Sequence, residues 1–172
     1  MKRVKILVID DDESLRRVLE YNLAQEGYAV LTAASGEQGL DLLKKEGADL
    51  VVTDVRMAGM DGLQVLERAH KLDPNVQVII ITAFGTIEMA VEAMKAGAFH
   101  YISKPFNRDE LKLTLRKALQ LKDLERENVA LRQELRARIG LDNIIADSRQ
   151  MKAILEMGER GAPTETTVLI LG

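Results

Sequence analysis

The sequence predicts an α/β fold, in which a five-stranded, parallel, doubly wound sheet is followed by a long helix. Three observations predict it. Short apolar runs alternate with amphipathic segments five times within about 120 residues. The apolar runs are continuous, as expected of strands that are buried on both faces. Strict alternation of strand and helix is typical of a parallel sheet with helices on both sides.

The expected strands are short and rich in Val, Ile and Leu. They span residues 4–9, 28–33, 50–53, 76–81 and 101–103. Polar residues that can accept a hydrogen bond from the first helical turn precede the helices between them. These predicted N-caps include Asp12, Ser35 (with Gln38 in a capping-box pattern), Asp61 and Asn107. Glycines mark two of the helix ends, at Gly27 and Gly97.

The composition limits the class of protein. The chain has 172 residues, of which 47% are hydrophobic and 30% charged, as in a globular protein with one full domain and an additional segment. A net charge of −3 gives no electrostatic argument for nucleic-acid binding by this chain. There is no cysteine, which excludes disulfides and thiolate metal sites. Because no apolar stretch approaches the length of a signal peptide or membrane span, we expect a cytoplasmic protein.

The last helix of this unit is unusually long. Neither Gly nor Pro occurs from Asp109 to about Arg138, a run far beyond an ordinary helix. From residue 121 onward the apolar spacing alternates between three and four residues, which is the heptad pattern of a coiled coil. The seam comprises Leu121, Leu124, Asn128, Leu131 and Leu135. An Asn at an a position favours a coiled coil of two parallel helices in register, so we expect a homodimer through residues 109–138. The alternative is a solvated amphipathic helix.

The end of the sequence is expected to be the beginning of a second domain. Gly140 interrupts the long helix, and a new amphipathic segment follows. Its apolar residues are Ile144, Ile145, Met151, Ile154 and Leu155. A final apolar run, residues 167–171, predicts a strand that opens onto Gly172, and such a strand needs neighbours to pair with. We therefore expect three parts: residues 1–120, 121–140 and 141–172.

Polar residues stand at the ends of four expected strands, where a parallel sheet places its ligands. They are Asp10, Asp11 and Asp12, then Asp54, Thr82 and Lys104. Converging carboxylates repel one another and must bind a cation or a proton. Oxygen ligands without His or Cys indicate Mg²⁺. With a lysine and a hydroxyl nearby, the cluster is equipped to handle a phosphoryl group, with Asp54 as the nucleophile.

Each of these residues also has an ordinary interpretation. Asp12 fits the N-cap of the first helix, Thr82 fits a plain strand end, and Lys104 fits a solvated side chain. Their joint occurrence at four strand ends favours the functional interpretation.

These residues resemble a response-regulator receiver domain. The matching motifs are residues 6–11, Asp54 with Met57 and residues 60–62, residues 82–83 and residues 104–106. The resemblance covers residues 1 to about 120 and implies the flavodoxin-like receiver fold. Residues 82–86 and 90–98 are similar to the NtrC-type subfamily, in which a helical linker joins the receiver to an AAA+ ATPase that activates sigma-54 RNA polymerase. Residues 144–172 resemble the start of that ATPase.

The resemblance implies a role for each site residue. Asp54 would be phosphorylated by a histidine kinase, Lys104 would contact the phosphoryl group, and Thr82 and Tyr101 would move in response. The Lys104–Pro105 bond is often cis in such domains. The implied Mg²⁺ ligands are Asp10 through water, Asp11, Asp54 and the backbone carbonyl of Arg56. Ala58 departs from the pattern, because the family usually has Pro there.

The predicted function is that of a phosphoacceptor signal receiver in a two-component system. It would take phosphate onto itself rather than act as an enzyme, because the ATPase motifs are absent from this chain. Phosphorylation would change the dimer geometry and so control the missing AAA+ domain. One alternative is a haloacid-dehalogenase-like phosphatase with Asp10 as the nucleophile, since residues 10–14 also fit that pattern; however, Asp54 precedes Thr82, the reverse of the expected order. Another is a plain dimerisation module with a degenerate receiver.

Overall fold

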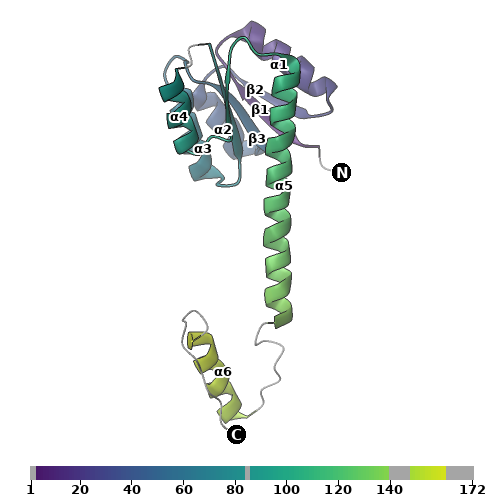
Figure 1. Ribbon diagram of the computed structural model, residues 1–172, viewed down its shortest axis with the longest axis vertical. Helices are drawn as coiled ribbons and strands as arrows, with labels where there is room; N and C mark the ends of the chain where they lie inside the picture. Colours follow the sequence, from purple (N-terminus) through teal and green to yellow (C-terminus); the bar gives the residue numbers. More distant parts are fainter. Residues whose placement is uncertain (1–2, 84–85, 140–147, 162–172) are drawn as a thin grey trace. The chain divides into compact units, whose positions relative to one another are not determined.

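The computed structural model describes residues 3–83, 86–139 and 148–161 (Figure 1). Within these residues, strand and helix alternate five times and one further helix follows. The strands are β1 (Lys5–Ile9), β2 (Ala29–Ala33), β3 (Leu50–Asp54), β4 (Gln77–Thr82) and β5 (His100–Ser103). The helices are α1 (Glu13–Gln25), α2 (Gly36–Glu46), α3 (Gly62–Leu72), α4 (Ile87–Lys95), α5 (Arg108–Ile139) and α6 (Arg149–Gly161). Each of the five strands expected within the first 120 residues is present, and its ends differ from the prediction by one residue at most.

The five strands form one parallel sheet in the order β2-β1-β3-β4-β5. This is the strand order of flavodoxin-like doubly wound folds, so the predicted fold class is confirmed. The register pairs Ile9 with Thr53 and Asp54 with Ile81. The carboxyl ends of β1, β3 and β4 therefore lie level at one edge of the sheet.

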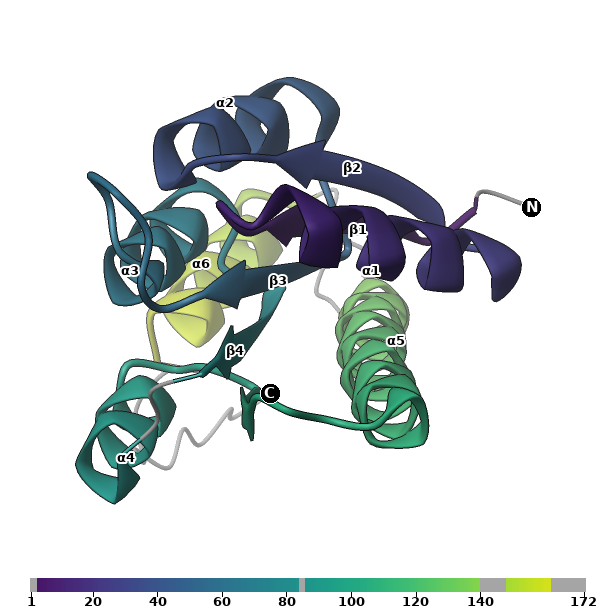
Figure 2. The same ribbon diagram turned by 90° about the horizontal axis from the view of Figure 1, so that it is seen from above.

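Helices cover both faces of the sheet (Figure 2). On one face lie α1 and α5, whose Leu19 and Leu115 belong to the same apolar cluster as Val8 of β1. On the other face lie α2, α3 and α4, where Val65 of α3 clusters with Val51 of β3. Successive strand residues point to opposite faces, and both faces are apolar here. The strands therefore appear in the sequence as continuous apolar runs.

Capping residues set the helix ends as predicted. Three predicted caps accept hydrogen bonds from backbone N–H groups in the first helical turn, namely Asp12, Asp61 and Asn107. Ser35 accepts from the Gln38 N–H at 3.3 Å, but the Gln38 side chain accepts from the Ala34 N–H rather than from Ser35 itself. The capping box is therefore displaced by one residue. Two predicted C-terminal glycines have positive φ, of 90° at Gly27 and 98° at Gly97.

The long helix α5 is continuous over 32 residues, as the absence of Gly and Pro predicted. The chain divides into two compact units, Met1–Glu125 and Arg126–Gly172. In the second unit, α6 forms part of the expected amphipathic segment. Ile144, Ile145, Gly172 and the expected strand at 167–171 lie outside the described residues. None of the described helices combines the length and apolar character that crossing a bilayer requires.

The start of α3 approaches the end of β3 so closely that a side chain would not fit. A Cβ added at Gly62 would lie 2.2 Å from the backbone oxygen of Asp54 and 2.9 Å from the Cα of Val55. The Gly62 N–H also donates to the Val55 carbonyl at 2.9 Å. Gly62 therefore fixes the backbone on which the Asp54 carboxylate stands.

We predict that Gly62→Ala lowers the free energy of unfolding by about 1–3 kcal/mol, because the added methyl must displace backbone atoms. Urea denaturation measures the effect. Gln64→Ala, an exposed position two residues along the same helix, serves as the control and should change stability little. Equal stability of the Gly62→Ala variant and the native chain would contradict the close approach.

Candidate functional site

Four strand ends bring the predicted site residues to the carboxyl edge of the sheet. Asp10 follows β1, Asp54 and Thr82 are the last residues of β3 and β4, and Lys104 follows β5. Asp10, Asp54 and Thr82 are buried, although two of them carry charges. A buried charge is stable only when it is paired and hydrogen-bonded, so their partners decide what this edge can do.

Lys104 is the partner of both carboxylates. Its Nζ lies 2.9 Å from Oδ2 of Asp10 and 2.5 Å from Oδ2 of Asp54. The side chains of Lys104, Asp10 and Asp54 are 17%, 4% and 10% exposed, so the three groups are largely removed from water. The Lys104 N–H donates to the Thr82 carbonyl at 2.7 Å, which holds the lysine's backbone beside β4. The Lys104–Pro105 peptide bond is cis, as the resemblance implied.

Backbone N–H groups hold the second oxygen of each carboxylate. Oδ1 of Asp10 accepts from the Asp12 N–H at 2.9 Å, and Oδ1 of Asp54 accepts from the Arg56 N–H at 3.1 Å. The guanidinium of Arg16 donates to the Asp10 carbonyl at 2.5 Å and ties this loop to α1. Each carboxylate therefore has one oxygen on Lys104 and one on the backbone, and both are fixed in orientation.

The charges of this cluster depend on one another. Burial raises the pKa of Asp10, and the hydrogen bond from Lys104 offsets part of that effect. Burial by itself lowers the pKa of Lys104, but its hydrogen bonds to Asp54 and Asp10 outweigh burial, and the net direction is upward. Lys104 thus holds its proton firmly, and that proton keeps Asp10 ionised in a poorly solvated place.

The predicted metal ligands offer only oxygen donors, which suits a hard cation such as Mg²⁺. Asp10 and Asp54 are adjacent, whereas Asp11 is exposed. Across residues 3–83, 86–139 and 148–161, no three His, Asp or Glu side chains are close enough to form a metal cage. A cation here would therefore keep several water ligands, as Mg²⁺ does, and would compete with Lys104 for Asp10 and Asp54.

Thr82 and Tyr101 lie on neighbouring strands beside the acidic pair. Thr82 is fully buried. Tyr101 is half-buried against the apolar cluster on the side of α2, α3 and α4, and its hydroxyl is buried without a hydrogen-bond partner among the described residues. Burial raises the pKa of Tyr101, and the charge of Asp54 raises it further. A buried hydroxyl without a hydrogen-bond partner costs free energy.

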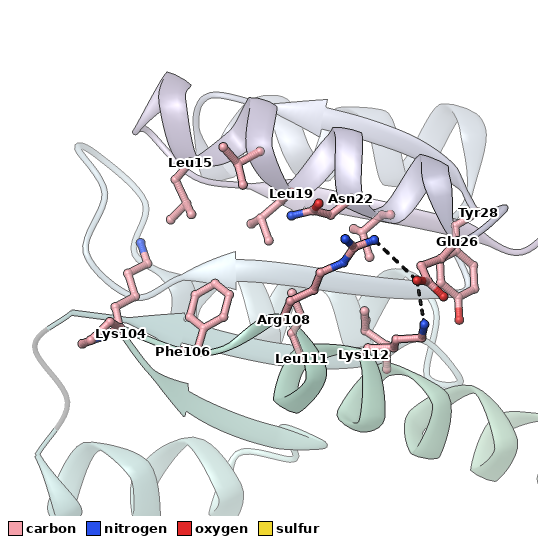
Figure 3. A pocket seen from close by; sticks show the side chains of 14 residues that line it. Leu15, Leu19, Asn22, Glu26, Tyr28, Lys104, Phe106, Arg108, Leu111 and Lys112 are labelled. Carbon is pink, nitrogen blue, oxygen red and sulfur yellow. Dashed lines mark hydrogen bonds and ion pairs between the residues drawn. The ribbon is translucent and has the colours of Figure 1, made fainter.

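A groove that the sequence did not predict lies between α1 and α5 (Figure 3). The groove has a volume of about 380 Å³, an apolar floor that includes Leu19 and Leu111, and Lys104 at one end. At the other end, Glu26 binds a cluster of cations at 2.7, 3.5 and 3.9 Å, from Lys112, Arg108 and Arg116 respectively. These residues are far apart in the sequence, so spacing could not reveal the groove. Val18 lies at an apolar position of α1 and lines this groove, where it is 55% exposed.

Comparison with known families supports the assignment of the fold. The response regulator receiver domain family matches residues 6–116. The chain belongs to the response regulator receiver family. Sporulation initiation phosphotransferase F of Bacillus subtilis (strain 168) is 41% identical over 122 residues, which cover 71% of this chain and 98% of that protein. The receiver domain protein (CheY-like) of Methanospirillum hungatei JF-1 is similar in structure, with a TM-score of 0.70 and 33% identity over 72% of this chain and 99% of that one.

Other relatives match nearly the whole chain and are much longer. Alginate biosynthesis transcriptional regulatory protein AlgB of Pseudomonas aeruginosa is 38% identical over 171 residues, but the chain spans only 38% of that protein. The structure of NtrX from Brucella abortus in complex with ADP has a TM-score of 0.71 and 32% identity over 95% of this chain and 35% of that one. The prediction that this chain contains a receiver domain of the NtrC-type subfamily is confirmed.

We predict that Lys104→Met lowers the free energy of unfolding by about 1–3 kcal/mol at neutral pH, because two buried carboxylates lose their shared cation. The measurement is urea denaturation. Lys45→Met removes an exposed lysine from α2 and is the control. A loss no larger than that of the control would show that the ion pairs contribute little.

The contribution of Lys104 to stability should also decrease at alkaline pH. The pKa of Lys104 is raised above its ordinary value of 10.5 in the folded chain. Its contribution is therefore fully present below pH 10.5 and is lost as the pH rises through the folded-state pKa. The difference in unfolding free energy between the native chain and Lys104→Met should shrink over that range. If the difference in unfolding free energy stayed constant over this pH range, the charge of Lys104 would not be the source of the stabilisation.

Proposed function

We propose that this chain is the phosphoacceptor receiver of a two-component system, and that a histidine kinase phosphorylates Asp54 in the presence of Mg²⁺. The arrangement of Asp10 and Asp54 around the ammonium of Lys104 carries the proposal. It provides a nucleophile, a second carboxylate for a cation and a mobile positive charge within one site. Family membership supports the same conclusion.

In the proposed reaction, an oxygen of Asp54 attacks the phosphorus of a phosphohistidine on the kinase. A bond forms from that oxygen to phosphorus as the bond from phosphorus to the imidazole nitrogen breaks, and the imidazole takes up a proton. Bound Mg²⁺ would neutralise charge on the phosphoryl oxygens. The residues proposed to hold it are Asp10 through water, Asp11, Asp54 and the carbonyl of Arg56.

The proposed response begins with Lys104 and Thr82. Because Lys104 already donates to Asp54, its ammonium can follow the negative charge onto the phosphoryl group. Thr82, at the end of the neighbouring strand, would donate its hydroxyl to the same group. Tyr101 would then turn and give its unpaired hydroxyl a partner. Such a movement alters the surface of α4, where Ile87, Val91 and Met94 are already exposed.

The proposed output is a homodimer through α5. The seam residues Leu121, Leu124 and Leu131 are exposed large apolar side chains on this helix. Exposed apolar residues at heptad spacing need a partner helix, and Asn128 favours a second copy in parallel register. The side chain of Leu135 is outside the described part of α5, so the last seam position stays a prediction.

In the longer protein that we propose, the receiver (residues 1–120) and the coiled-coil linker (121–140) would control an AAA+ domain that starts at residue 141. That domain would act on sigma-54 RNA polymerase in the cytoplasm, and this chain would itself be regulatory rather than enzymatic. The relatives matched along nearly the whole chain support this proposal, since one is a transcriptional regulatory protein and another was solved with ATP. Neither the family match nor these relatives support the phosphatase alternative.

We predict that acetyl phosphate with Mg²⁺ adds one phosphoryl group to the chain, and that Asp54→Asn abolishes the addition because the nucleophilic oxygen is lost. Mass spectrometry of the intact chain and of its peptides measures the product. Asp41→Asn, an exposed carboxylate on α2, should leave it unchanged. Phosphate found on Asp10 would instead support the phosphatase alternative.

We predict that Leu131→Glu weakens self-association at least tenfold, because it buries a charge in the proposed seam. Val129→Glu is a closely matched control, since Val129 and Leu131 lie on the same helix and are 55% and 52% exposed. Sedimentation velocity with and without beryllofluoride measures both association and its dependence on the phosphorylated state. Equal effects of the two substitutions would remove the seam from the proposal. Identical sedimentation with and without beryllofluoride would remove the dimer switch.

A further inference from the structure

A lysine on α5 is almost completely buried although the proposed reaction does not use it. Lys122 is 2% exposed and lies beyond residues 6–116, which the receiver family matches. Its Nζ donates to the backbone carbonyl of Asp49 at 3.0 Å and lies 3.4 Å from Oδ1 of the same residue. Lys122 thus forms both a hydrogen bond and an ion pair with the same residue, Asp49.

Asp49 is in turn fixed to the sheet at the edge opposite the acidic site. It immediately precedes β3, and its Oδ2 accepts from the Lys5 N–H at 3.0 Å. The Asp49 N–H donates to the Lys5 carbonyl at 2.7 Å. The acceptor for Lys122 is therefore held by hydrogen bonds at the amino ends of β1 and β3.

Removing this pair would be costly for the helix. A buried ammonium is stable only while its partner remains in place, because the alternative is an unpaired charge in a poorly solvated site. If α5 turned about its axis or lifted from the sheet near residue 122, Lys122 would lose Asp49. The pair therefore opposes both movements at Lys122, beyond which the described side chains of α5 are exposed.

We propose that Lys122 is a positioning residue that locks α5 to the amino-terminal edge of the sheet and fixes the rotation at which the helix leaves the receiver. The buried residues described on α5 follow helical spacing, and they are Leu111, Thr114, Leu115, Ala118 and Lys122. Leu121 and Leu124 are exposed, and at 100° per residue they point about 100° and about 160° away from Lys122 around the helix. Locking Lys122 inward thus turns the first seam residues outward.

The lock rests on contacts within the first unit and not on phosphorylation, so it can be tested separately from the proposed function. Amide hydrogen exchange along α5 is the measurement, because it reports local opening residue by residue. We expect Lys122→Met and Asp49→Asn each to accelerate exchange of amides 119–126 about tenfold, equivalent to about 1.4 kcal/mol of opening free energy. The exchange of amides in β1 and β4 should change less than that.

Two comparisons make the test decisive. Lys117→Met removes an exposed lysine from the same helix and should leave the exchange of amides 119–126 as in the native chain. The double variant Asp49→Asn/Lys122→Met should exchange no faster than Lys122→Met, since Lys122→Met already removes the ion pair that Asp49→Asn removes, together with the hydrogen bond to the Asp49 carbonyl. Unchanged exchange in Lys122→Met, or fully additive effects in the double variant, would overturn the proposal. Acceleration spread equally over the β-strands would overturn it as well, because the effect would then be on global stability.

Discussion

Two carboxylates can be buried at the edge of this sheet because one ammonium pairs with both. Lys104 stands at the end of β5, whereas Asp54 and Asp10 stand at the ends of β3 and β1. Strand β4 lies between them, so the cation must reach across a neighbouring strand. A long unbranched side chain can do so, and the strand that it crosses ends on the small residue Thr82. The order of the strands, the length of the lysine and the size of the threonine are therefore parts of one requirement.

This requirement explains which parts of the site could be predicted from the sequence. Strands that are buried on both faces are recognisable as apolar runs, and the residue after each run falls at a known edge once the sheet is parallel. Asp10, Asp54, Thr82 and Lys104 were accessible to that argument. The cation bridge was not, because no spacing in the sequence states that the Lys104 ammonium will lie between two carboxylates rather than in water.

Contacts between distant segments account for the rest. The groove lies between α1 and α5, and at its end Glu26 pairs with Lys112, which is 86 positions away along the chain. Lys122 has the composition of a solvated helix position, and only its contact with Asp49 across 73 positions makes it a buried one. Local sequence sets the propensity and the caps of each helix, whereas side-chain partners of this kind depend on how the complete sheet is assembled.

The buried hydroxyl of Tyr101 gives the protein a built-in optical reporter. The chain contains no tryptophan and only three tyrosines, so its near-ultraviolet absorption and emission come chiefly from phenol rings. Tyr21 is exposed, whereas the hydroxyl of Tyr101 is shielded from water. A change in the surroundings of that one ring would appear directly in the tyrosine spectrum of the unlabelled protein. The state of the acidic edge could then be followed in real time without a dye or an introduced residue.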